Sequence, residues 1–138
     1  MHGIFRALCA AAALVMLLLM AGCGHNLPAT TQKLPHYPGA VNWVEHEPDS
    51  DQRLLNIYNT ASFTTGDDPE SVLNFYRDTL TGDGWEIDPF QPDPSGLTLR
   101  WTSEEQPPAT YLCIVTTSLS QTNATTIVEV EMRNNPGY

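Results

Sequence analysis

The chain has 138 residues, which is enough for one domain with its own hydrophobic core. Sixteen acidic residues against six basic ones give a formal net charge of −10, so phosphate backbones repel the chain and nucleic acid is not expected as a partner. Three cysteines are present and none forms a CxxC pair, which excludes a zinc site of that type.

The first residues have the layout of a bacterial export signal. Met1–Arg6 supplies one fixed positive charge, and Ala7–Met20 is an apolar run of 14 residues, short for a membrane span. The run leads into Leu19-Met20-Ala21-Gly22-Cys23, which resembles the lipobox of bacterial lipoproteins, although leucine is more common where Met20 stands. The alternative is an ordinary secretory signal or an N-terminal anchor helix in which Cys23 is incidental.

The lipobox resemblance implies a signal peptide over residues 1–22, cleavage between Gly22 and Cys23, and acyl groups such as palmitate on Cys23. The expected location is then the cell membrane or the outer membrane, on its extracytoplasmic side, with the membrane as a partner through that lipid. After cleavage, five basic and 16 acidic residues remain, a formal charge of −11. Because anionic headgroups repel such a domain, its attachment depends on the lipid. Cys113 is left as the one cysteine of the mature domain, so no disulfide within it is expected.

The mature chain is expected to begin with a flexible tether. Residues 23–36 are polar and punctuated by proline, and the turn signal Tyr37-Pro38-Gly39-Ala40 follows, so we place a single domain at 37–138. Val41–Glu47 is predicted to be the first strand, and Pro48–Asp51 a turn.

Residues 53–65 alternate between apolar and polar side chains, which predicts a strand with one buried face. Leu55, Ile57, Ala61 and Phe63 share the apolar face. Asn59 interrupts that alternation and indicates a bulge.

The clearest segment predicts a helix. Asp67-Asp68-Pro69-Glu70 combines a capping aspartate with proline at the first helical position. The residues with helical spacing that form one apolar stripe, with Leu73 beside it, are Val72, Phe75, Tyr76 and Leu80. Gly82 and Gly84 are expected to end the helix.

Strands alone are predicted after this helix. They cover residues 85–88, 97–102, 109–118 and 125–133, and the third is apolar on both faces, which is typical of a central strand. The predicted fold class is therefore α+β, one helix packed on an antiparallel sheet of five or six strands.

One further resemblance covers about half of the mature chain. Tyr37-Pro38-Gly39-Ala40, followed by Phe75-Tyr76, Leu80 and Gly84-Trp85, is similar to a recurring pattern in small uncharacterised bacterial lipoproteins. The resemblance implies the same fold and adds no activity. Each of these residues also has a structural explanation, as turn, core stripe or helix stop.

No catalytic residue, metal site or cofactor is expected. Cys113 lies within an apolar strand, where a thiol is usually structural. In Glu45-His46-Glu47 neighbouring side chains point to opposite faces of a strand, which argues against a metal site. Capping accounts for Asp67-Asp68, although such a pair could serve as acid and base.

Three functions are considered. The first is a non-catalytic docking or envelope-accessory module, with Tyr58, Leu112 and Ile114 as an exposed patch on the sheet face that the helix leaves uncovered. The alternative is a small-ligand binder with a pocket lined by tryptophan, namely by Trp43, Trp85 or Trp101. An envelope hydrolase is the third, and it requires a cleft with convergent titratable groups.

Overall fold

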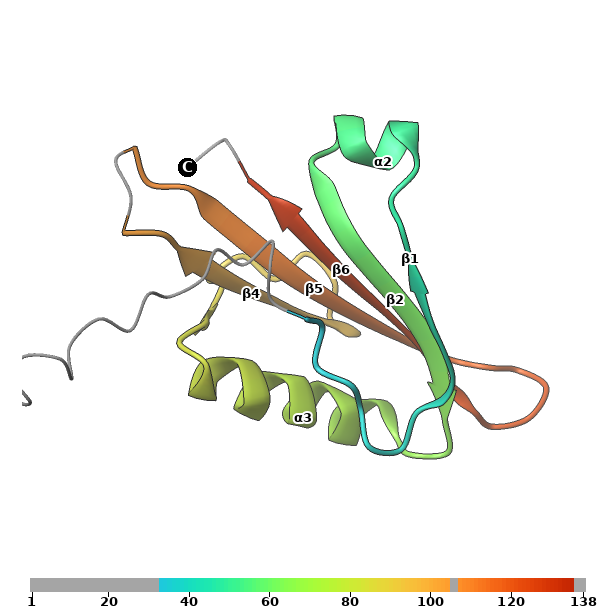
Figure 1. Ribbon diagram of the computed structural model, residues 1–138. Helices are drawn as coiled ribbons and strands as arrows, with labels where there is room; N and C mark the ends of the chain where they lie inside the picture. The colour runs from blue at the N-terminus through green and yellow to red at the C-terminus, as the bar shows by residue number, and fades with distance from the viewer. Residues whose placement is uncertain (1–32, 105–106, 136–138) are drawn as a thin grey trace, which may run out of the picture.

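The computed structural model describes residues 33–104 and 107–135. They form one six-stranded sheet with strand order β1-β2-β6-β5-β4-β3, in which every neighbouring pair is antiparallel. The strands are β1 (Val41–His46), β2 (Ile57–Thr65), β3 (Glu86–Ile87), β4 (Gly96–Thr102), β5 (Thr110–Leu119) and β6 (Thr126–Asn134), and the helices are α2 (Ser50–Leu54) and α3 (Pro69–Gly82). The helix α3 lies across one face of the sheet (Figure 1). The predicted fold class is therefore confirmed.

The core lies between α3 and the sheet. Val72, Tyr76 and Leu80 of the predicted stripe are buried, at one-turn intervals along the helix. They face alternate residues of the strands: in β5 Cys113 and Val115 are fully buried, and in β6 Val128 and Val130 are. Since β5 and β6 occupy the middle of the sheet, the prediction that residues 109–118 form a central strand is confirmed.

The start of α3 follows directly from its sequence. The Asp68 side chain accepts a hydrogen bond from the Ser71 backbone N–H at 2.9 Å, and Pro69 fills the first turn, where its missing N–H costs nothing. The helix ends at Gly82, and Gly84 follows with φ of 90°, a conformation that glycine adopts without strain. Both predicted ends are confirmed.

The region from Ser50 to Asn56 differs from the prediction. Ser50–Leu54 forms the short helix α2, because Asp49 and Gln52 build a capping box in which each side chain accepts from the other's backbone N–H. Asn56 then adopts φ of 59°, a left-handed conformation that asparagine tolerates. The strand therefore begins at Ile57, and Leu55, which was predicted on its buried face, is 66% exposed.

Two strands carry irregularities. The register between β2 and β6 shifts between Ile57 and Asn59, so the predicted bulge is confirmed. The register between β1 and β2 shifts between Val41 and Val44, and Asn42 lies there with φ of 57°. As a result the edge strand β1 is kinked.

The folded part begins before the predicted boundary at Tyr37. Leu34 belongs to the hydrophobic core and is 4% exposed, and the Pro35 carbonyl accepts a hydrogen bond from the Tyr76 hydroxyl at 3.0 Å. The segment runs beside α3 before it enters β1 (Figure 1). The prediction of a tether through His36 is thus wrong at its C-terminal end, because one buried leucine outweighs the polar composition around it.

Candidate ligand-binding groove

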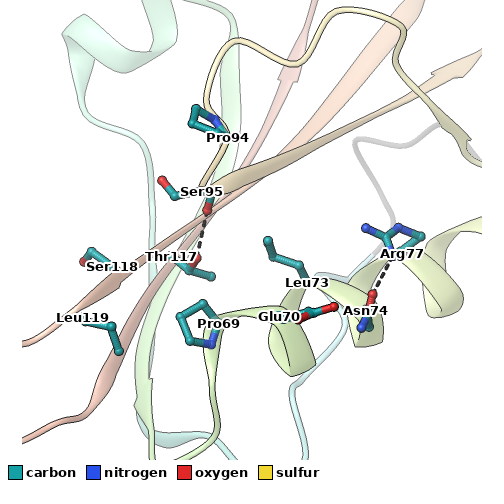
Figure 2. A pocket seen from close by; sticks show the side chains of 10 residues that line it. All are labelled: Pro69, Glu70, Leu73, Asn74, Arg77, Pro94, Ser95, Thr117, Ser118 and Leu119. Carbon is teal, nitrogen blue, oxygen red and sulfur yellow. Dashed lines mark hydrogen bonds between the residues drawn. The ribbon is translucent and has the colours of Figure 1, made fainter.

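A groove of about 580 Å³ lies beside α3, at the end of the sheet where β5 finishes. Its lining residues come from three segments: Pro69, Glu70, Leu73, Asn74 and Arg77 from α3, Pro94 and Ser95 from the loop before β4, and Thr117, Ser118 and Leu119 from β5 (Figure 2). The volume is within the range of small-molecule sites. Apolar and polar side chains both line it, so the groove suits an amphipathic molecule.

The helix contributes its wall through four-residue spacing. Pro69, Leu73 and Arg77 lie one turn apart and so project from the same side of α3. In Figure 2 Leu73 extends toward the strand side of the groove. The buried residues of the core stripe lie on the neighbouring side of the helix, and Leu73, which packs partly against the core, lies between the two.

Hydrogen bonds hold the opposite wall in place. Both the backbone N–H and the hydroxyl of Thr117 donate to the Ser95 carbonyl, at 3.2 and 2.8 Å. The Asp93 carboxylate in turn accepts from the Ser95 hydroxyl at 2.7 Å and from its N–H at 2.8 Å. These bonds lower the pKa of Asp93 below its ordinary value. The loop carrying Pro94 is thereby fixed against β5.

The ionisable side chains of the groove are Glu70 and Arg77. Arg77 is half-buried, and its Nη1 donates to the Asn74 side-chain oxygen (Figure 2). Arg100 and Arg133, by contrast, each pair with a carboxylate, Glu86 at 3.2 Å and Glu131 at 3.8 Å. Within the described residues, then, the guanidinium of the groove is held by a neutral amide.

The tryptophans predicted to line a pocket do not line this groove. Trp85 and Trp101 are 2% and 8% exposed and belong to the core. Trp43 packs its ring on Phe63, with centroids 5.3 Å apart. Trp101 lines a separate, smaller cavity of about 250 Å³ beside β3, whose other walls include Glu86 and Arg100. Trp43 and Trp85 serve packing, so a pocket lined by them is a wrong prediction.

The predicted patch is not an exposed apolar surface either. Leu112 is 6% exposed and lies in register between Arg100 of β4 and Arg133 of β6, whose long stems can cover an apolar neighbour. Ile114 is half-buried, and Tyr58 is 42% exposed on another strand. Three leucines are exposed within the described residues: Leu54 and Leu55 at α2, and Leu119 at the end of β5.

The candidate chemical groups have structural roles. Cys113 is fully buried, and burial, with a smaller contribution from the charge of Glu131, raises the pKa of its thiol to about 12. His46 contacts the Ser62 hydroxyl at 3.2 Å, and the Asp67 carboxylate accepts from the Tyr37 hydroxyl at 2.6 Å. Within residues 33–104 and 107–135, no three His, Cys, Asp or Glu side chains are grouped so that they could hold a metal ion.

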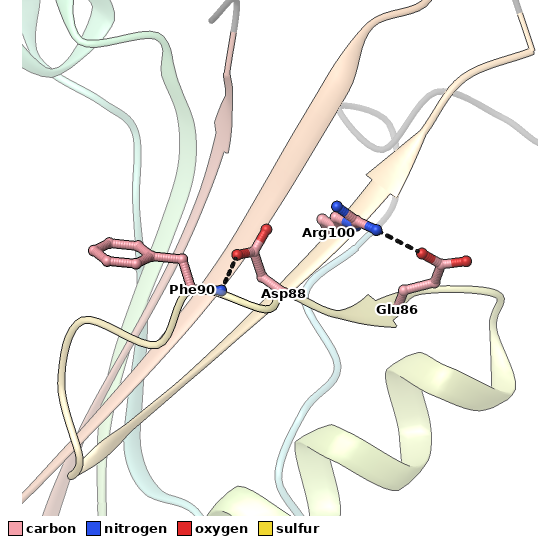
Figure 3. A network of polar contacts seen from close by, with 4 residues as sticks. All are labelled: Glu86, Asp88, Phe90 and Arg100. Atoms are coloured by element: carbon pink, nitrogen blue, oxygen red, sulfur yellow. Dashed lines mark hydrogen bonds and ion pairs between the residues drawn. The ribbon is translucent and has the colours of Figure 1, made fainter. Parts of the chain in front are cut away.

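A polar network closes the sheet edge at β3. Arg100 bonds Glu86, and the buried Asp88 carboxylate accepts from the Phe90 N–H at 2.7 Å (Figure 3). Next to it the Gln91 side chain bonds both the N–H and the carbonyl of Thr98, at 2.8 and 2.9 Å. The Thr98 carbonyl also accepts from the Asp88 N–H at 2.9 Å, so the Gln91 side chain continues the pairing of β4 just beyond the end of β3.

The remaining site predictions, Gly22 and Cys23, lie outside the described residues. Among the residues that are described, no helix has the length and apolar character needed to cross a bilayer.

Comparison with known proteins gave one match. Residues 46–106 match a family model described as START domain-like, which covers less than half of the chain. The matched range includes α2, β2, α3, β3 and β4, and therefore two of the three segments that line the groove. No curated protein and no solved structure matched.

Proposed function

We propose that this chain is a lipid-anchored bacterial lipoprotein whose extracytoplasmic domain binds a small amphipathic ligand in the groove beside α3. The observation that carries the ligand-binding part is the groove itself, about 580 Å³ with Leu73 and Leu119 among its apolar walls. The START domain-like match supports this part, because it hints at a ligand-binding fold.

The anchoring part is supported by the sequence Leu19–Cys23. Acyl chains on Cys23 contribute about 0.8 kcal/mol per buried methylene, enough with several chains for durable attachment of an acidic domain. The test is mass spectrometry of the N-terminus from a membrane fraction. A diacylglyceryl adduct on Cys23 is expected, and a Cys23→Ser chain that is processed and retained in the membrane like the wild type would overturn the proposal.

The ligand-binding part can be tested in membranes that carry the full chain. A neutral ten-carbon alcohol with a photoactivatable diazirine is added, irradiated, and the adducts are located by fragment-ion mapping. We expect adducts concentrated on residues 69–77 and 117–119, which line the groove.

Two exposed leucines supply a matched pair of variants. Leu119 lines the groove and is 63% exposed, whereas Leu54 is 81% exposed on α2 and does not line it. Replacing either by asparagine removes an apolar surface without opening the core. We expect Leu119→Asn to lower groove labelling about fivefold, in line with the loss of roughly 1 kcal/mol of apolar contact, and Leu54→Asn to leave it unchanged. Uniform labelling of the surface would contradict a binding site.

We also propose that the domain is non-catalytic. Neither histidine nor cysteine lines the groove within the described residues, and the Ser95 hydroxyl is engaged by Asp93. Protein docking remains a prediction with less support, since Leu112 of the patch on which it depended is buried. Pull-downs from membranes with the wild-type chain and a Tyr58→Asp variant test it, because Tyr58 is the exposed member of the patch, and identical partner lists would count against docking there.

A further inference from the structure

We infer that the ligand of this groove carries one anionic group, a carboxylate or a phosphate ester, which Arg77 binds while its apolar body lies along Leu73. This inference rests on the proposed ligand-binding function and adds the chemical class of the ligand.

The state of Arg77 is the first reason. A guanidinium has five N–H donors in a planar fork that matches carboxylate and phosphate oxygens. Within the described residues, the Arg77 guanidinium donates to the Asn74 amide oxygen and to no carboxylate. The other N–H groups of the Arg77 guanidinium are the donors that two oxygens of a carboxylate or phosphate would accept from in a bidentate contact.

The order of side chains along α3 is the second reason. Glu70 and Arg77 are seven residues apart, which places them roughly 10 Å apart along the helix axis. Leu73 lies between them, so the apolar contact is central and the cation is at one end. A molecule with its charge at one end and a chain of several carbons can contact Leu73 and Arg77 together without bringing its charge to Glu70.

The partial burial of Arg77 is the third reason. Charges at a half-buried site are screened less by salt than those of fully exposed side chains. The local attraction at Arg77 can therefore act within a chain whose net charge of −10 repels anions at longer range. A cationic head group would meet Arg77 unfavourably, and a neutral one would leave its donors to water.

The experiment uses the same membranes with three ten-carbon photoprobes, a decanoate, a decyl phosphate and a decanol analogue. Each probe is compared between wild type and variant in the same membrane, so differences in partitioning cancel. Arg77→Gln removes the charge, Arg77→Lys keeps it, and Arg133→Gln removes an equal charge from the opposite face of the sheet as the matched control.

We expect Arg77→Gln to lower groove labelling by at least one anionic probe about tenfold, the loss expected for a charge-assisted hydrogen bond. Labelling by the decanol probe should be unchanged, Arg77→Lys should restore part of the loss, and Arg133→Gln should have no effect. The anionic probe with the larger loss identifies carboxylate or phosphate as the head group.

Other outcomes would overturn the inference. Unchanged anionic labelling in Arg77→Gln, or an equal loss for decanol, would show that Arg77 acts structurally or not at all. If the decanol probe labels the wild-type groove but both anionic probes do not, the ligand class is wrong while the ligand-binding function stands. If none of the probes labels the groove, the ligand-binding function itself fails.

Discussion

Replacing Gly39 with alanine tests how the N-terminal segment is held on the domain. The Tyr37 hydroxyl donates to Asp67 Oδ2 at 2.6 Å, and Gly39 lies against this pair. A Cβ at residue 39 would come within 2.6 Å of that same Asp67 oxygen, and within 2.9 and 3.1 Å of Tyr37 Cε1 and Thr65 Oγ1. The φ of Gly39 is outside the left-handed region, so the expected effect is steric and not a backbone preference.

The size of the effect follows from the bond that must yield. Real Cβ atoms essentially never approach another atom to 2.6 Å, so the Asp67 carboxylate has to move and its hydrogen bond from Tyr37 is lost. A hydrogen bond to a charged group contributes about 1.5–3 kcal/mol. We therefore expect Gly39→Ala to lower the free energy of unfolding by about 2 kcal/mol, and Asp67→Ala, which removes the same bond, by a similar amount.

A double-mutant cycle measured by urea unfolding decides the question. If both changes act through one bond, the double variant loses about 2 kcal/mol and not about 4, a coupling well above the 0.5 kcal/mol scatter of independent sites. Gly66→Ala is the control, because a Cβ there meets nothing within 4 Å. Additive losses from Gly39→Ala and Asp67→Ala, at unchanged m-value, would refute the reasoning.

Three further predictions concern stability. Gly82→Ala should stabilise the protein by about 0.5–1 kcal/mol, since residue 82 is helical with open space around it. Gly84→Ala should destabilise the protein by about 1 kcal/mol or more, because Gly84 has a φ of 90°. Thermal melts of the two variants should therefore shift in opposite directions. Burial raises the pKa of Tyr37 from 10.0, and that of Cys113 from 9.0, to about 12. The folded protein therefore keeps protons that the unfolded chain releases, so this contribution to stability should be complete below pH 9 and fall as the pH rises through 12. A urea midpoint that stays constant over that range would contradict this prediction. Asp68→Ala should cost about 1 kcal/mol through loss of the α3 cap, whereas Asp68→Asn should cost less because the amide oxygen still caps; equal losses would exclude capping as the reason.

The features predicted correctly from the sequence are those set by local interactions. The cap at Asp68, the stripe through Tyr76 and the bulge near Asn59 each depend on residues within a few positions of one another. The antiparallel sheet was expected from the alternation in the strands, and in β2 and β6 the buried residues do recur on one face.

The failures have identifiable physical reasons. Leu55 fits the alternation of the following strand, but the Asp49–Gln52 capping box favours a helical turn there, and its spacing of three residues was the signal available. Leu34 belongs to the core although its neighbours have a composition typical of a linker, and the adjacent Pro35 carbonyl bonds Tyr76, 41 residues further along the chain. Such long-range contacts have no local signature.

The groove was missed for the same reason. Residues 69–77, 94–95 and 117–119 form its walls, and only the folded sheet brings them together. The four-residue spacing of Leu73 and Arg77 was the one local signal, because it indicates a second face on α3 beside the core stripe. The tryptophans do not mark the groove, because the size of the ring suits a core as well as a pocket.

The two margins of the sheet bear on how neighbouring copies behave. Under the proposed anchoring, copies of the chain would share one plane, where a straight outer strand with unpaired backbone groups could pair with a second copy. Here the register shift near Asn42 disrupts one margin, and the strand at the other margin, β3, is only two residues long. Beyond the end of β3, the Gln91 amide bonds the backbone groups of Thr98 in β4. Both margins are therefore short or irregular, which is how sheets limit edge-to-edge pairing between copies.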